Sequence, residues 1–184
     1  MDDRKIIIDE ILIPSLRMLY HEDYINILWK VSERNICARL AHHMENAMRK
    51  YDERHWSHSF DGYYADVEYN RMGNGDLKRF ENFEKVPQYM VSDLLIQSRG
   101  NSQNLLAVEM KRNDNYKNRK EDKERLMSLV SSRVQNESCV HNTLLGAFIV
   151  YSKDEVKIEF FENNGGTEAQ TNQLVLSSVE LRAD

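Results

Sequence analysis

The chain has 184 residues, of which 41% are hydrophobic and 30% are charged, and its formal net charge is −5. This length and composition are typical of a single folded domain and argue against a disordered chain. The negative balance excludes a protein that coats nucleic acid through its overall charge, so any positive surface has to be local.

The chain shows no targeting or membrane signal. No apolar run approaches the roughly 18 residues that a membrane span needs, and the first residues do not begin a signal peptide. Cys37 and Cys139 are isolated and offer no disulfide framework. We therefore expect a soluble, cytoplasmic protein with no membrane partner.

Residues 1–31 are expected to form a helical segment ahead of the main domain. Residues 4–30 are rich in isoleucine and leucine at helical spacing, and Pro14 interrupts the pattern. The segment is predicted to cover one face of a sheet, and its apolar density leaves room for a homodimer contact.

A second helix is predicted from Ser32, a good N-cap residue, to about Lys50. Glu33 lies in its first turn, where a carboxylate suits the helix dipole. Its spacing also places it on the apolar stripe of the helix, with Ile36 and Leu40. A carboxylate there is either paired inside the protein or directed at a metal, and the helix alone leaves both interpretations open.

The polar stretch 52–61 is expected to be a loop that leads into a strand over residues 63–71. Alternation places Asp66 and Glu68 on the face opposite Ala65 and Val67. Asp66 and Glu68 are secondary candidates for a site if that face looks toward it, and the alternative is a solvated strand face. Residues 72–85 are polar and are expected to form a loop.

Two short apolar strands, 91–97 and 104–110, are joined by a polar link and predict a β-hairpin. Glu109 and Lys111 are two residues apart, so in a strand their side chains leave the same face about 7 Å apart. The hairpin brings Asp93 opposite Glu109. Two close carboxylates repel each other unless a divalent cation such as Mg²⁺ lies between them, so we expect a cation site with Lys111 beside it.

The pattern of Asp93, fifteen residues, then Glu109-Met110-Lys111 resembles the D…E-x-K signature of the PD-(D/E)XK, or restriction-endonuclease-like, nuclease superfamily. The likeness extends to Ser32-Glu33-Arg34 and to residues 66–71, which are similar to segments of small, largely uncharacterised bacterial members. It covers roughly residues 30 to 150. One departure is Ser92, where many members have proline, but that proline is not a metal ligand.

The resemblance implies an α/β fold with a mixed central β-sheet flanked by helices, in the core order α-β-β-β-α-β. We expect one domain over residues 1–184, with this core at 32–161, the helical segment before it and a C-terminal extension at 162–184. The implied activity is metal-dependent hydrolysis of phosphodiester bonds in nucleic acid, with DNA favoured over RNA. The alternative is a module of the same fold that binds nucleic acid or protein without cutting.

The resemblance also assigns roles to the site residues. Asp93 and Glu109 would bind Mg²⁺ or Mn²⁺ together with the carbonyl of Met110. Glu33 would complete the shell directly or through water, and Lys111 would orient the attacking water.

Positive charge gathers after the hairpin, at the start of a helix predicted over residues 113–134. Between Lys111 and Arg125, seven basic residues accompany four acidic ones. Mixed charge of this kind can serve solubility alone. In a nuclease it would hold the phosphate backbone, through the basic side chains Arg112, Lys117, Arg119, Lys120 and Lys123.

The remaining elements are strands. The compact apolar stretch 144–151 follows the helix, so strand, helix and strand form a crossover that predicts a parallel pair. An edge strand is expected at 156–161 and a short strand at 174–176, followed by a polar tail.

Overall fold

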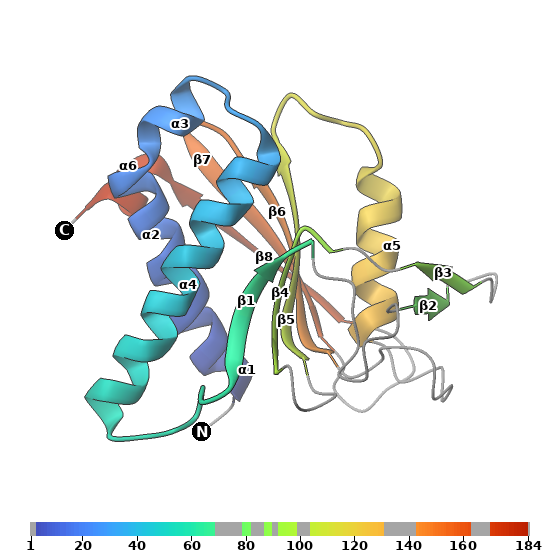
Figure 1. The fold of residues 1–184 in the computed structure, drawn as a ribbon. Helices are drawn as coiled ribbons and strands as arrows, with labels where there is room; N and C mark the ends of the chain where they lie inside the picture. The colour runs from blue at the N-terminus through green and yellow to red at the C-terminus, as the bar shows by residue number, and fades with distance from the viewer. Residues whose placement is uncertain are drawn as a thin grey trace.

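The computed structural model describes residues 3–68, 79–81, 87–89, 92–98, 104–130, 143–162 and 170–183. Within these ranges the protein is a mixed α/β fold in which a six-stranded sheet lies between two helical layers (Figure 1). No helix in the described ranges combines the length and apolarity needed to cross a bilayer.

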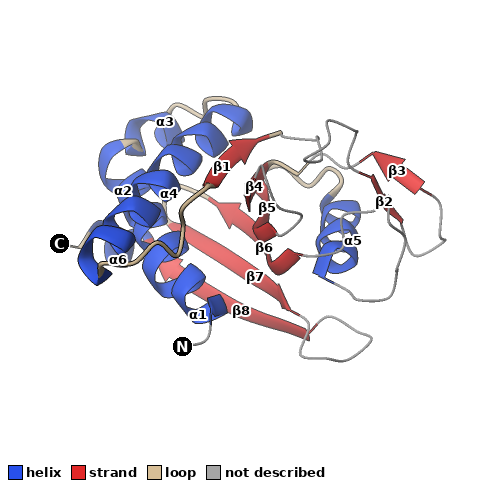
Figure 2. Ribbon diagram, turned by 60° about the horizontal axis from the view of Figure 1, so that its bottom comes forward, coloured by secondary structure: helices blue, strands red, loops and turns tan. Residues whose placement is uncertain are grey.

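The sheet has the strand order β1-β4-β5-β6-β7-β8. All neighbouring strands are antiparallel except β5 and β6, which helix α5 connects in the crossover predicted from the sequence. The strands are β1 (Tyr63–Val67), β4 (Leu94–Ser98), β5 (Asn104–Arg112), β6 (Thr143–Tyr151), β7 (Glu155–Glu162) and β8 (Gln170–Ser177). A separate pair, β2 (Arg79–Glu81) and β3 (Pro87–Tyr89), lies on the α5 side (Figure 2).

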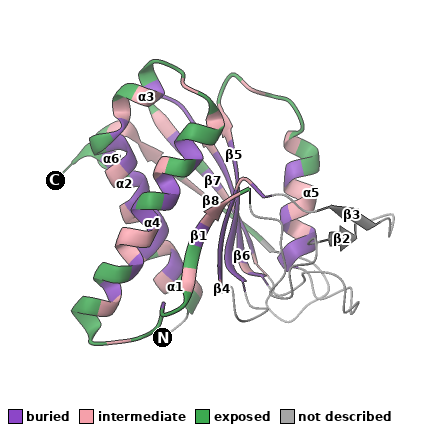
Figure 3. Cartoon of the chain, viewed as in Figure 1, coloured by how far each residue is buried: buried purple, intermediate pink, exposed green. Residues whose placement is uncertain are grey.

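One helical layer packs against the face of the sheet that carries Leu106, Val108 and Met110. The buried residues of this face and of the helices form one apolar core, seen in Figure 3 as the buried sides that face each other. The layer consists of α1 (Asp3–Ile6), the π-helix η1 (Ile7–Leu12), α2 (Ile13–Glu22), α3 (Tyr24–Leu28), α4 (Glu33–His55) and α6 (Ser178–Arg182).

The N-terminal helical segment covers the sheet, as predicted. Its apolar residues, such as Ile11, Leu16 and Leu19, are fully buried inside the chain. Pro14 does not interrupt the segment, because it lies in the first turn of α2, directly after the π-helix, where proline is tolerated. Most of the apolar residues that suggested a homodimer contact are therefore used within one chain, whereas Ile25 and Leu28 are exposed, and a homodimer stays a prediction.

The second layer is helix α5 (Arg119–Val130), which covers the opposite face of β5 and β6. Leu126, Leu129 and Val130 bury their side chains against Leu95, Ala107 and Phe148 in a smaller second core. Two polar residues of α5, Asp122 and Ser128, are also buried.

Several predicted boundaries were wrong for local reasons. Helix α4 starts after the Ser32 cap as expected but continues to His55, and the left-handed Trp56 ends it. Strand β1 ends at Val67 because Glu68 is left-handed, with φ 51°, and residues 69–71 of the predicted strand lie outside the described ranges.

Strand β4 begins at Leu94, so Asp93 precedes the strand instead of lying inside it. The helix predicted from residue 113 begins at Arg119, after turns. In the predicted loop 72–85, residues 79–81 form β2. The C-terminal extension supplies β8, which is longer than the predicted strand and completes the sheet.

Candidate functional site

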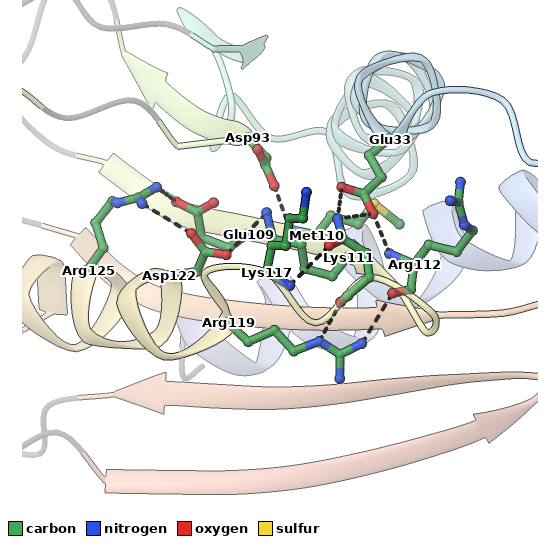
Figure 4. Close-up of polar contacts among 11 residues, drawn as sticks. Glu33, Asp93, Glu109, Met110, Lys111, Arg112, Lys117, Arg119, Asp122 and Arg125 are labelled. Atoms are coloured by element: carbon green, nitrogen blue, oxygen red, sulfur yellow. Dashed lines mark hydrogen bonds and ion pairs between the residues drawn. The ribbon is translucent and has the colours of Figure 1, made fainter.

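The site lies along the part of β5 that extends past the start of β4. Leu94, the first residue of β4, pairs with Val108, whereas β5 continues to Arg112. On this open edge the N–H of Met110 donates to Asp93 Oδ2 at 2.8 Å, and the N–H of Arg112 donates to Glu33 Oε1 at 2.8 Å (Figure 4). Two carboxylates thus accept the backbone hydrogen bonds that a neighbouring strand would have taken.

The carbonyl of Met110 faces the same open edge. In a strand the N–H and C=O of one residue point to the same side, so this carbonyl lies between the two N–H groups that Asp93 and Glu33 bind. The Met110 side chain is buried in the core, with its Sδ 3.8 Å from Cys37 Sγ. The open edge therefore presents two carboxylates and one backbone carbonyl.

Glu109 and Lys111 leave the other face of β5, toward helix α5, as the two-residue spacing predicted. Glu109 is 1% exposed, and Arg125 Nη1 donates to its Oε1 at 2.6 Å. The Lys111 ammonium is 3.1 Å from Asp122 Oδ2, and Arg125 Nη2 donates to Asp122 Oδ1 at 3.1 Å. We call these four residues, Glu109, Lys111, Asp122 and Arg125, the charge cluster.

Burial and mutual charge shift the protonation of this cluster. Burial raises the pKa of Glu109 well above its ordinary range, against the attraction of Arg125, and Asp93 and Asp122 raise it further. Burial likewise raises the pKa of Asp122, opposed by Lys111 and Arg125. Burial is the largest cause of both shifts and outweighs the attraction of the two cations.

The pKa of Lys111 is also raised, which for an amine favours the charged form. Burial acts to lower its pKa, but Asp122, with smaller contributions from Asp93 and Glu33, raises it overall. Lys111 is therefore a permanent ammonium at neutral pH. The charges of Asp93 and Glu33 at the open edge thus favour the charged form of Lys111 on the adjacent face of β5.

Glu33 is more engaged with protein groups than predicted. Its oxygens accept hydrogen bonds from the Arg112 N–H and from Asn115 Nδ2, at 2.9 and 3.0 Å. This is the paired arrangement that the sequence left open, although the partners are two amides. The role of Glu33 as a metal ligand stays a prediction.

The secondary candidates make other contacts: Asp66 lies on β1, beside β4, and Glu68 follows β1. Asp66 Oδ2 accepts a hydrogen bond from Gln97 Nε2 at 3.0 Å. Glu68 pairs with Arg34 at 2.9 Å, and its backbone N–H donates to the carbonyl of Asp93. Glu68 thus helps to position Asp93, but its own carboxylate is directed at α4.

Most basic side chains predicted to hold nucleic acid are used within the chain. Arg119 donates to the backbone carbonyls of Arg112, Asn113 and Asn115, which braces the turn after β5. Arg112 pairs with Asp114 at 2.6 Å, and Lys123 with Glu159 at 2.6 Å. Lys120 is largely exposed beside Glu124, and Lys117 is exposed with no ion pair among the described residues.

Sequence reasoning counted Asp122 and Arg125 only as part of a charged stretch and missed their place in the site. The available signal was the position of Asp122, four residues before Leu126 on the apolar stripe of α5, where a carboxylate is expected to be buried. Asp122 is 3% exposed. Glu33 was singled out for the same reason, because it is a carboxylate on the apolar stripe of a helix.

The donors at the site suit a hard divalent cation. Asp93, Glu109 and the Met110 carbonyl offer oxygen only, which Mg²⁺ and Mn²⁺ prefer. Among the described residues, no group of three His, Cys, Asp or Glu side chains suited to a metal ion is found.

Comparisons with known proteins were negative: no family model matches the chain, and neither curated proteins nor solved structures gave a significant match. The chemistry of the site therefore carries the functional argument.

Proposed function

We propose that this protein is a metal-dependent nuclease of the PD-(D/E)XK type that hydrolyses phosphodiester bonds, with DNA favoured over RNA. The observation that carries the proposal is the position of four groups on one stretch of β5: Asp93 and the Met110 carbonyl lie at its open edge, and Glu109 and Lys111 leave the adjacent face toward α5. The order α4-β1-β4-β5-α5-β6 supports it, because it is the α-β-β-β-α-β order that the resemblance implies, with β2 and β3 as an insertion.

The proposed ligands are Asp93, Glu109 and the Met110 carbonyl. A Mg²⁺ or Mn²⁺ ion held there would polarise the phosphodiester and lower the pKa of an attacking water. Asp93 is already oriented, because its other oxygen accepts the Met110 N–H. Glu109 lies on a central strand and is buried, so neighbouring atoms restrict the movement of its carboxylate.

Lys111 acts in this proposal as a cation and a hydrogen-bond donor. Since its pKa is raised by Asp122, it does not serve as a general base at neutral pH. Its ammonium would orient the water, favour its hydroxide form and stabilise the negative charge that develops on the phosphate oxygens. Asp122 holds the ammonium in place through the 3.1 Å ion pair.

Substrate contacts are assigned to fewer side chains than the sequence suggested. Lys117 and Lys120 are exposed near the start of α5 and are the best placed to meet phosphates. Arg112 and Lys123 would first have to leave Asp114 and Glu159.

Calorimetry with Mn²⁺ tests the proposal directly. We expect one stoichiometric site in the wild type and its loss in Asp93→Asn, which keeps an acceptor for the Met110 N–H and removes only the charge. Asp61→Asn, on an exposed acid that pairs with His58, is the matched control and should bind as the wild type does. Cleavage assays on single-stranded and double-stranded DNA and RNA would then identify the substrate.

A second candidate is a module that binds nucleic acid or protein without cutting. It is favoured by the internal pairing of Glu109 with Arg125 and of Lys111 with Asp122, because a paired cluster can be purely structural. Absence of Mn²⁺ binding in the wild type and in the Arg125 variants described below would favour this candidate.

A further inference from the structure

The shortest polar contact of the charge cluster joins a proposed metal ligand to a cation of the protein itself. Arg125 Nη1 lies 2.6 Å from Glu109 Oε1. A guanidinium does not lose its proton in a protein, so it cannot vacate a carboxylate by deprotonation. A divalent cation bound to Glu109 has to compete with the guanidinium for this carboxylate, because two positive charges held by one carboxylate repel each other.

We infer that Arg125 is the resident counter-ion of Glu109 and that a divalent cation displaces it when the site is loaded. This inference rests on the proposed function, because it concerns the same metal position. It assigns Arg125 a role in controlling access of the metal to Glu109.

The two partners differ in their freedom to move. Glu109 lies on a central strand and is 1% exposed, whereas the Arg125 side chain is 21% exposed and extends from a helix at the surface of the sheet. Arg125 also has a second anchor, Asp122 Oδ1 at 3.1 Å. Rotation of the Arg125 side chain can therefore release Glu109 while one ion pair is kept.

Helix α5 need not move for this exchange. Leu126 and Leu129 are fully buried against the sheet and hold the helix backbone in place. Lys111 keeps Asp122 as its partner throughout, so the proposed catalytic cation stays oriented. The exchange is confined to one long side chain.

The test is the Mn²⁺ affinity of Arg125 variants, measured by calorimetry without nucleic acid. Arg125→Gln removes the competing charge and should bind Mn²⁺ about tenfold more tightly or better, since a charge-assisted hydrogen bond contributes at least that factor. Arg125→Lys keeps a weaker, single-point partner and should lie between, at least about threefold tighter than the wild type.

Arg49→Gln controls for the loss of one positive charge. Arg49 pairs with Glu45 on the exposed side of α4 at 2.9 Å, so this variant changes net charge and breaks an arginine–glutamate pair away from the site. Its Mn²⁺ affinity should match that of the wild type.

The outcomes separate this inference from the proposed function. If the wild type binds Mn²⁺ in a manner that depends on Asp93, but Arg125→Gln binds no more tightly than Arg49→Gln, the inference is overturned and the metal site stands. If neither the wild type nor any Arg125 variant binds Mn²⁺, both fall. Should Arg125→Gln fail to fold, Arg125→Lys decides, and an affinity equal to or weaker than that of the wild type overturns the inference.

Discussion

Replacing Glu33 by alanine removes the acceptor at the far end of the open edge of β5. The carboxylate accepts hydrogen bonds from the Arg112 N–H at 2.8 Å and from Asn115 Nδ2 at 2.9 and 3.0 Å. Strand β4 begins opposite Val108 and does not reach the level of Arg112, so β4 cannot accept the Arg112 N–H. The turn after β5 would lose its connection to helix α4.

The expected loss of stability follows from the two groups that donate to Glu33, the Arg112 N–H and the Asn115 amide. A hydrogen bond to a charged group contributes roughly 1.5–3 kcal/mol, and Glu33 is partly exposed, so water recovers some of the loss. We therefore expect Glu33→Ala to lower the free energy of unfolding by about 2–3 kcal/mol. For a chain of this size, that corresponds to a fall in Tm of roughly 4–12 °C.

Urea and thermal unfolding in EDTA would measure the effect without any metal. Glu33→Gln keeps an oxygen for the Arg112 N–H and should lose about half as much. Glu53→Ala, on an exposed residue of the same helix, should stay within about 0.5 kcal/mol of the wild type. A cost for Glu33→Ala no larger than that of Glu53→Ala would refute the bracing role. Loss of Mn²⁺ affinity with unchanged stability would identify Glu33 as a metal ligand instead.

Three further changes probe other parts of the site. Burial raises the pKa of Glu109, so the stabilising contribution of its protonated form is complete below about pH 4 and is lost as pH rises toward the raised value. The free energy of unfolding of Glu109→Gln should therefore rise relative to that of the wild type as pH rises. Urea titrations with EDTA from about pH 4 to about pH 8 would measure the difference. A difference that stays constant over this range would contradict the raised pKa of Glu109. Lys111→Ala should lower kcat by about 100-fold or more. It should leave the Kd for Mn²⁺ within about threefold of the wild type, and a parallel loss of both would assign Lys111 to metal binding. Gly146→Ala would place a Cβ 3.3 Å from Phe161 Cβ and 3.4 Å from Leu126 Cβ. It should cost about 1–2 kcal/mol in thermal unfolding, and an unchanged Tm would show that α5 can shift away from the sheet.

The fold was largely predictable because its elements follow local rules. The Ser32 cap, the apolar alternation of β5 and the compact apolar run of β6 each depend on residues close together in the chain. The crossover through α5 and the parallel pair followed from element order and chain reach. Boundaries failed at single residues with a left-handed backbone, such as Trp56 and Glu68, and at Glu68 a tertiary hydrogen bond from its N–H to the Asp93 carbonyl accompanies the turn.

The candidate site was predictable in part. Strand geometry was enough to place Glu109 and Lys111 on one face of β5, and the hairpin brings Asp93 beside that strand, where it accepts the Met110 N–H. That the three side chains share a metal site stays a prediction. The partners of Glu109 and Lys111 were not predictable, because a charged helix offers several residues of each sign at similar spacing. Only the packing of Leu126 against the sheet selects Asp122 and Arg125 as the pair that faces β5.

The sequence by itself determined that two acids and a lysine share one end of a hairpin inside an α/β chain, since a period of two places Glu109 and Lys111 on one face wherever β5 lies. The tertiary structure alone decided that β4 stops short of the end of β5, leaving an edge that Asp93 and Glu33 complete. Glu33 and Arg112 are 79 residues apart, so their contact depends on how helix α4 packs on the sheet. No local pattern encodes a contact over that separation.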